Sequence, residues 1–182
     1  MIYVVSGYMR CGTSMMMEAL QAGGLQAAYS ERRDIEMNAR WGEPGYLPNE
    51  RYFELDAYDY RRPDFAQVYD GKLVKVLFGG AIRLPPGEYR CVFMRRPTEQ
   101  IAQSLLAFFG EVPELVESGR LDAEIERALA ILRDRRSFLQ IEEVWLHDVI
   151  ENPRAVFERL GWPIDVEKAA AVPSRDKLRV AA

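Results

Sequence analysis

Residues near the N-terminus have the types and spacing of a phosphate-binding loop. The pattern is Gly7-x-x-x-x-Gly12, within the stretch VVSGYMRCGTSMMM. An apolar run from Ile2 to Val5 precedes it, and residues Thr13 to Leu20 are expected to form a helix. A glycine-rich turn between a strand and a helix directs backbone N–H groups at one point, where the helix dipole adds partial positive charge. The pattern therefore predicts an anion site, the alternative being that the glycines only make a tight turn.

The loop departs from that of nucleotide triphosphatases at the position where those proteins carry a lysine. Thr13 stands there, Ser14 follows it, and the cation of the loop comes earlier, at Arg10. In triphosphatases the lysine reaches the β- and γ-phosphates, and the next hydroxyl binds Mg²⁺. No second acidic motif for Mg²⁺ stands out after an apolar strand. We therefore expect the loop to hold one 5′-phosphate and to require no metal ion.

A second group of polar residues lies in the stretch FMRRPTEQIAQS. Arg95 and Arg96 end an expected strand, and Ser104 lies eight residues beyond Arg96, on the helix that follows. An arginine at a strand end and a hydroxyl on the next helix can converge on one phosphate, with the arginine binding it in a bidentate manner. Taken alone, this pattern is a weak indication, since arginines near the start of a helix are often solvated.

The order of the expected elements predicts an α/β fold in a single domain over residues 1–182. Strands are expected at 2–5, 25–29, 72–78, 89–94 and 142–146, and helices at 13–20, 101–109, 121–133, 153–160 and 165–172. This alternation implies three layers, a parallel sheet with helices on both faces. Ligands of such sheets lie beyond the carboxyl ends of the strands, where both motifs fall.

The stretch from Ser30 to about Phe65 lacks a clear pattern and is rich in charged and aromatic residues. It is long for a structureless loop, so we expect it to be partly helical or functional, as an acceptor or lid segment. Its aromatic residues could line an acceptor pocket or form a small satellite core: Trp41, Tyr46, Tyr52, Phe53, Tyr58 and Tyr60.

Composition excludes several classes of protein. The chain has 182 residues, 48% of them hydrophobic, and a net charge of −4, which argues against a nucleic-acid partner. Two distant cysteines give neither a disulfide framework nor a metal-binding spacing. No apolar run approaches the roughly 20 residues of a membrane helix, and a strand pattern that begins at residue 2 leaves no room for a signal peptide. We expect a soluble, cytoplasmic protein with no membrane partner.

The two motifs together resemble those of sulfotransferases that use 3′-phosphoadenosine 5′-phosphosulfate (PAPS). RCGTSMM is similar to the 5′-phosphosulfate loop of that family, and Arg96 with Ser104 matches its 3′-phosphate site. The later stretch VWLHDVIENPRAVFERLGWPID also resembles a segment of the family. The resemblance leaves residues from about Arg32 to Phe65 unmatched.

This resemblance implies a phosphate-loop-type fold, PAPS as the cofactor and 3′-phosphoadenosine 5′-phosphate (PAP) as its product. The residues that it assigns to binding the cofactor come from both motifs: Gly7, Arg10, Cys11, Gly12, Thr13, Ser14, Arg96 and Ser104. The family has a small residue at the position of Cys11, so the thiol is interpreted as filling space.

Sulfuryl transfer requires cations around the transferred group and a base that takes the proton of the acceptor. Arg10 and the loop amides suit the first task. Lys75 is a second candidate cation, because many members of the family carry a lysine in the strand that approaches the transferred group. The cytosolic branch places its histidine base two residues after that lysine, where this chain has Leu77. The only histidine, His147, is interpreted as structural rather than catalytic.

Glu31 is the expected base. It stands 21 residues after Arg10, the spacing of the glutamate that the tyrosylprotein branch of the family uses. Burial would have to raise its pKa from about 4.3 to make it an effective base. The alternative is a solvated carboxylate beside Arg32 and Arg33.

The sequence thus predicts transfer of a sulfuryl group from PAPS to a hydroxyl or amine of a small-molecule or peptide acceptor. Two alternatives stay open. One is a protein that binds PAP or PAPS without catalysis, and the other is a phosphotransferase of the wider phosphate-loop class that uses Mg²⁺–ATP.

Overall fold

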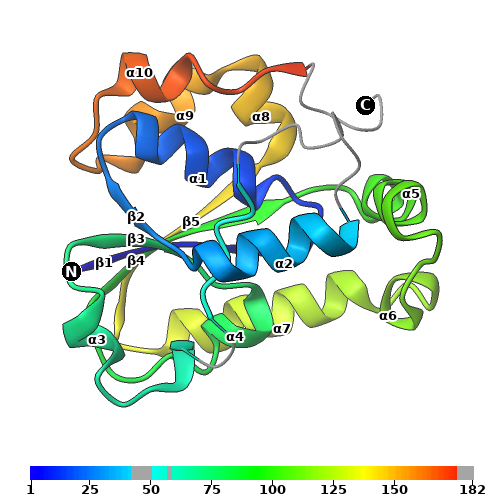
Figure 1. The fold of residues 1–182 in the computed structure, drawn as a ribbon, viewed down its shortest axis with the longest axis horizontal. Helices are drawn as coiled ribbons and strands as arrows, with labels where there is room; N and C mark the ends of the chain where they lie inside the picture. Colours follow the sequence, from blue (N-terminus) through cyan, green and yellow to red (C-terminus); the bar gives the residue numbers. More distant parts are fainter. Residues whose placement is uncertain (42–50, 57–58, 176–182) are drawn as a thin grey trace.

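Five parallel strands form one sheet with helices on both faces, as the sequence predicts (Figure 1). The computed structural model describes residues 1–41, 51–56 and 59–175. The strands lie in the order β2-β3-β1-β4-β5. Their bounds are β1 Ile2–Gly7, β2 Gln26–Ala28, β3 Lys72–Lys75, β4 Tyr89–Arg95 and β5 Phe138–Trp145. The α/β fold with three layers is therefore confirmed.

The helices divide between the two faces of the sheet (Figure 1). Helices α1 (Thr13–Ala22), α8 (Leu146–Glu151), α9 (Pro153–Leu160) and α10 (Val166–Ala170) cover one face. Helices α3 (Phe65–Val68), α4 (Phe78–Ala81) and α7 (Leu121–Asp134) lie on the other. The remaining elements are α2 (Glu31–Trp41), η1 (Asp59–Arg61), α5 (Thr98–Phe109) and α6 (Glu114–Glu117). Of the helices in these described ranges, none has the length and apolarity to span a bilayer.

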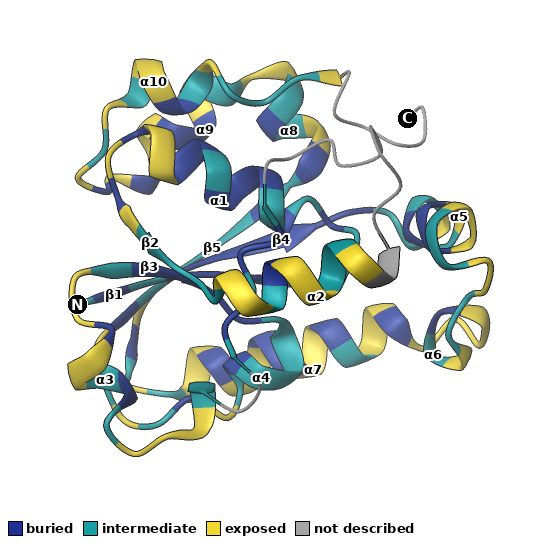
Figure 2. Cartoon of the chain, in the orientation of Figure 1, coloured by how far each residue is buried: buried dark blue, intermediate teal, exposed yellow. Residues whose placement is uncertain are grey.

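The core lies around the two central strands, β1 and β4, which are buried along almost their whole length (Figure 2). Strands of a parallel sheet that is covered on both faces are expected to be continuous apolar runs, which is how both appear in the sequence. The edge strands β2 and β5 are only partly buried. This difference explains why the central strands were the easiest elements to predict.

The strand order places residues 7–12, for which the sequence predicts phosphate binding and which are called the phosphate loop below, beside the end of β4. Strand β1 lies between β3 and β4, and Gly7 at its end is in register with Met94, one residue before Arg95. The loop after β1 and the arginines after β4 therefore leave the sheet side by side, at its carboxyl edge. This position is the one where sheets of this kind bind ligands.

Some boundaries differ from those predicted. The strand expected to reach Phe78 ends at Lys75, and the chain turns into the short helix α4. The last strand begins at Phe138 rather than Glu142. The patternless segment is partly helical, since α2 and η1 lie in it, whereas residues 42–50 and 57–58, which include Tyr46 and Tyr58, fall outside the described residues.

Gly7 supports a prediction about stability. Its φ is +138°, and a Cβ atom at this position would lie 2.6 Å from the backbone oxygen of Met94. Gly7→Ala should lower the free energy of unfolding by roughly 1–3 kcal/mol, because both the strain and the clash fall on rigid backbone. Urea denaturation measures this change.

Gly79→Ala is the matched control for Gly7→Ala. Gly79 lies in α4, and a Cβ atom there meets nothing within 4 Å. Because alanine favours a helix over glycine by roughly 0.5–1 kcal/mol, this variant should be as stable as the wild type or slightly more stable. Equal stability of the two variants would contradict the proposed backbone constraint at Gly7.

Candidate functional site

The phosphate loop carries left-handed backbone conformations at Arg10 (φ 68°) and Gly12 (φ 85°). Gly12 is the N-cap of α1, and its carbonyl accepts the first hydrogen bond of the helix, from Met16 at 3.0 Å. The first N–H groups of a helix have no partner within it. The N-terminus of α1 therefore presents donors to the carboxyl edge of the sheet, where an anion would lie.

A lysine reaches this loop from the neighbouring strand. Lys75, the last residue of β3, donates from Nζ to Ser14 Oγ at 3.2 Å. Its side chain is almost fully buried. The chain thus places an ammonium group at the start of α1 although Thr13 occupies the usual lysine position.

Arg96, Arg10 and Ser104 come together beside the loop. Arg96 Nη1 donates to the backbone oxygen of Arg10 at 3.1 Å, and Arg10 Nε donates to Ser104 Oγ at 3.0 Å. The Arg10 guanidinium also lies 4.7 Å from the centre of the Phe108 ring. The structure therefore joins the two sequence motifs in one cluster. The Arg10 side chain is directed at Ser104 and not at the start of α1, where Lys75 lies.

Arg96 has hydrogen-bonding capacity left over. The residue is 6% exposed, its Nε donates to Gln100, and its buried Nη2 has no hydrogen-bond partner among the described residues. Burial lowers the pKa of Arg96, because loss of hydration disfavours the charged form. A buried donor without a partner costs free energy, so an anion at this point would be stabilised.

Arg95, its neighbour, has a different environment. It pairs with Glu126 and Glu143, each at 2.7 Å, and its guanidinium lies 5.2 Å from the centre of the Trp145 ring. These contacts join the end of β4 to α7 and β5. Arg95 is therefore a structural ion-pair residue, and the candidate anion ligand of the pair is Arg96.

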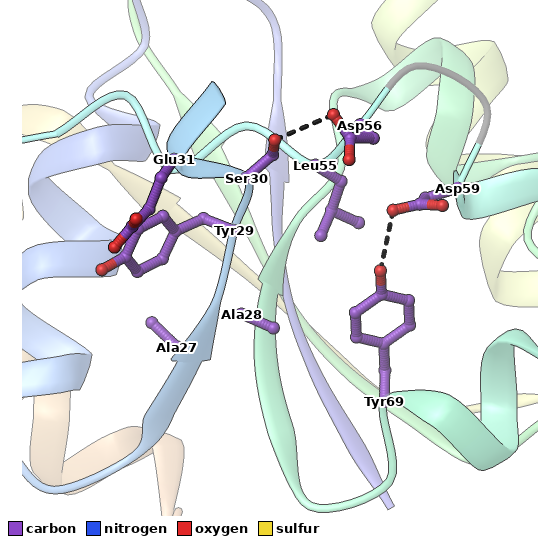
Figure 3. A pocket seen from close by; sticks show the side chains of 9 residues that line it. All are labelled: Ala27, Ala28, Tyr29, Ser30, Glu31, Leu55, Asp56, Asp59 and Tyr69. Atoms are coloured by element: carbon purple, nitrogen blue, oxygen red, sulfur yellow. Dashed lines mark hydrogen bonds between the residues drawn. The ribbon is translucent and has the colours of Figure 1, made fainter. Parts of the chain in front are cut away.

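Glu31 lies apart from these groups. It is the exposed first residue of α2 and lines a cavity of about 480 Å³ together with residues of β2 and with Asp56, Asp59 and Tyr69 (Figure 3). Neither Lys75 nor any loop residue lines this cavity. Among the described residues, Glu31 has no hydrogen-bond or ion-pair partner. The structure does not bring the expected base to the expected cations.

Two other candidates from the sequence, Cys11 and His147, form no hydrogen bond with Lys75, Arg96 or Arg10 among the contacts described above. The Cys11 thiol is buried, and burial is the main reason that its pKa rises to about 12, so it fills space as expected. His147 is exposed at the start of α8 and pairs with Asp148 at 3.2 Å. The Cys11 thiol therefore contributes no charge at the loop.

The short segment 51–56 contributes groups that the sequence reasoning missed. Lys75 Nζ donates to the backbone oxygen of Tyr52 and forms an ion pair with Glu54 at 2.7 Å. Glu54 and Lys75 also form an isolated parallel β-bridge. The only local signal is the apolar pattern of YFEL, which is too short to distinguish a strand from a loop.

Asp34 on α2 fixes this segment. Its Oδ1 accepts from the backbone N–H groups of Tyr52 at 3.1 Å and of Phe53 at 3.2 Å. The Phe53 N–H belongs to the same peptide group as the Tyr52 carbonyl, which accepts from Lys75 and, at 3.3 Å, from Ser14. Phe53 itself has a φ of 59°. One peptide group therefore links the buried Asp34 carboxylate to the lysine at the loop.

Comparison with known proteins gives no family for this chain. No model of a known protein family matches it, and no curated protein matches it either. The functional argument therefore depends on the geometry described above.

Asp34 yields a prediction about pH. Burial raises its pKa, while the N–H groups of Tyr52 and Phe53, Arg51 and Lys75 act in the opposite direction. A carboxyl with a raised pKa in the folded state binds more protons folded than unfolded. The wild type should therefore lose stability relative to Asp34→Asn as pH rises from about 4 through the raised pKa.

Urea denaturation at several pH values between 4 and 7 measures this difference. Asp165→Asn is the control with the opposite sign: hydrogen bonding to Lys168 N–H lowers the pKa of Asp165, so the wild type should gain stability over that variant as pH rises. Asp34→Ala should cost about 1–3 kcal/mol near pH 4, because two buried N–H groups lose their acceptor, and this cost should fall as pH rises because the same carboxyl is removed. A pH-independent difference between the wild type and Asp34→Asn would contradict the assignment.

Proposed function

We propose that this protein is a sulfotransferase-like enzyme that transfers a sulfuryl group from PAPS to a hydroxyl or amine acceptor. The observation that carries the proposal is the pairing of two anion-binding arrangements at one sheet edge. One is the loop with Lys75, and the other is Arg96 with Ser104 and Arg10. A nucleotide with phosphates at both its 5′ and 3′ positions is a ligand that uses both.

The loop would hold the 5′-phosphosulfate. The N–H groups at the start of α1 suit a phosphate oxygen, and Lys75 with Ser14 suits the oxygens of the transferred group or of the leaving phosphate. Positioned donors of this kind stabilise charge where it develops in the transition state. This arrangement replaces the loop lysine of triphosphatases by a lysine from β3.

The buried guanidinium of Arg96 would hold the 3′-phosphate. Its Nη2 has no hydrogen-bond partner within the described part of the chain, and Arg10 links the guanidinium to Ser104 through its own backbone oxygen and its Nε. Charge-assisted hydrogen bonds from a buried arginine are strong and directional. The ligand expected here is therefore a phosphate rather than a neutral group.

The alternative of a Mg²⁺–ATP phosphotransferase receives support from one contact, that between Lys75 and Ser14, because a lysine and a hydroxyl meet at the loop as they do in triphosphatases. It gives no function to the unpartnered Nη2 of Arg96. A protein that binds PAP without catalysis uses the same two sites and differs only in its lack of turnover.

Calorimetric titration with PAP, beside Mg²⁺–ATP, tests the proposal. We expect micromolar binding of PAP that weakens at least tenfold in Arg96→Ala, a loss of about 1.4 kcal/mol or more. Binding of Mg²⁺–ATP in place of PAP would overturn the sulfotransferase proposal, and binding of neither would remove the nucleotide site.

Arg90→Ala is the matched control for this titration. Arg90 lies on the same strand, β4, near its opposite end, where Nη1 is 3.4 Å from the backbone oxygen of Gly161. Removing it changes the net charge by the same amount without touching the carboxyl edge of the sheet. PAP affinity should stay within about threefold of the wild type, a change below 1 kcal/mol.

A further inference from the structure

Glu54 places a carboxylate beside Lys75, close to the loop. Its carboxylate is 2.7 Å from Lys75 Nζ, and the same Nζ is 3.2 Å from Ser14 Oγ on the first turn of α1. Lys75 therefore contacts both Ser14, at the start of α1, and the Glu54 carboxylate. Glu31, by contrast, lines the cavity on the side of β2 (Figure 3).

The backbone of Glu54 is held on two sides. Its carbonyl accepts from the N–H of Ser30 at 2.8 Å, and the residue forms a parallel β-bridge with Lys75 at the end of β3. Phe53 and Leu55 on either side of it are buried in the core. The Glu54 side chain itself is not buried with these neighbours, since it is partly exposed and pairs with Lys75.

The Glu54 side chain remains accessible, unlike its partner. It is 27% exposed, whereas the Lys75 side chain is 3% exposed. An acceptor arriving from solvent can therefore contact the carboxylate while the ammonium group stays in a protected environment. Asp34, the other carboxylate of this region, is buried, and its Oδ1 already accepts two backbone N–H groups.

The hydrogen bonds of Lys75 allow an exchange of partners. An ammonium group has three N–H donors, and here they face Tyr52 O, Ser14 Oγ and Glu54. A sulfuryl or phosphate oxygen on the loop can take over one of them. Of the three partners of Lys75, the partly exposed Glu54 carboxylate can leave the ammonium group with the least rearrangement. It can then accept a hydrogen bond from the acceptor instead.

We propose that Glu54, and not Glu31, takes the proton of the acceptor, an inference that rests on the proposed sulfotransferase function. The acceptor oxygen or nitrogen attacks the sulfur of PAPS and forms the new bond to it. The bond between sulfur and the bridging 5′-phosphate oxygen breaks, and its electron pair leaves with PAP. The proton of the acceptor moves to the Glu54 carboxylate, while Lys75 stabilises the charge on the leaving phosphate.

The test measures release of PAP from PAPS, with 2-naphthol, tyramine and water as acceptors, together with the affinity for PAP. Glu54→Gln keeps the shape of the side chain and its contact with Lys75 but cannot accept a proton. We expect turnover to fall at least about 100-fold, the usual contribution of general base catalysis, with PAP affinity within about threefold of the wild type.

Two further readouts separate a base from a structural ion pair. The wild-type rate should fall at acid pH as the carboxylate is protonated, and the residual rate of Glu54→Gln should lack this acid limb. Formate, a small carboxylate, should restore part of the turnover of Glu54→Ala, since it supplies a base in the space left by the side chain. Thermal melting of each variant confirms that it is folded.

Glu142→Gln is the matched control. Glu142 on β5 is 31% exposed and lies 3.8 Å from Arg159, so it resembles Glu54 in exposure and in having a cationic neighbour. Its turnover should equal that of the wild type, which shows that loss of a partly exposed, paired carboxylate has no effect by itself.

Several outcomes would overturn the proposal. Undiminished turnover in Glu54→Gln would show that Glu54 is not the base. Loss of turnover in Glu31→Gln instead would identify Glu31 as the base, as the sequence predicts. Loss of PAP affinity in Glu54→Gln would give Glu54 a binding role through Lys75. A wild type that binds PAP but never releases it from PAPS would refute the base and leave a non-catalytic PAP-binding protein, whereas a wild type that binds no PAP would refute the proposed function itself.

Discussion

The site depends on the parallel pairing of β1 with both of its neighbours. Because β3 and β4 run in the same direction as β1, all three strands end at one edge of the sheet. Three residues that lie far apart in the sequence, Gly7, Lys75 and Arg95, end these strands. No loop has to be long or flexible to bring the loop amides, an ammonium group and a guanidinium together, since the sheet itself does so.

Four charged side chains are buried around this edge, and they differ in how far their charges are compensated by partners. A buried charge is tolerated only where hydrogen bonds or an opposite charge compensate for lost hydration. Arg95 has two carboxylates, and Lys75 has one carboxylate and two oxygen acceptors. Arg96 and Asp34 each retain a buried polar atom that has no hydrogen-bond partner among the described residues, although Arg51 lies 3.9 Å from that atom of Asp34. Arg96 is therefore the one of these three cations that has a buried N–H donor, at Nη2, without a hydrogen-bond partner among the described residues.

The parts of the fold and site that the sequence predicts are those with local signals. The apolar runs of β1 and β4, the loop glycines and the eight-residue spacing from Arg96 to Ser104 all lie within short windows. The extent of β5 was missed because the residues from Phe138 to Glu143 mix apolar and charged types, as suits a partly buried edge strand. The end of β3 was missed because apolar residues continue beyond Lys75 into the turn.

The contacts of segment 51–56 could not be predicted, because no local pattern in the sequence indicates them. Glu54 meets Lys75 across 21 positions of the chain, and Asp34 meets Tyr52 across 18. Their positions depend on how α2 packs, which periodicity does not specify. Glu31 could be chosen as a candidate base from its spacing to Arg10 in the sequence. Glu54 can be recognised as a candidate only once the structure places segment 51–56 beside the end of β3.

The origin of the lysine has a consequence for how relatives of this chain can be found. In the triphosphatase motif, the glycines, the lysine and the hydroxyl are neighbours in one stretch of sequence, so a pattern written along the chain contains them all. Here the ammonium group that contacts Ser14 enters from the next strand, 61 positions away. A search along the sequence finds a loop without its lysine, followed later by an ordinary strand. A search written across the sheet, which pairs the first helical turn after β1 with the last residue of the adjacent parallel strand, would find the same chemical groups in contact.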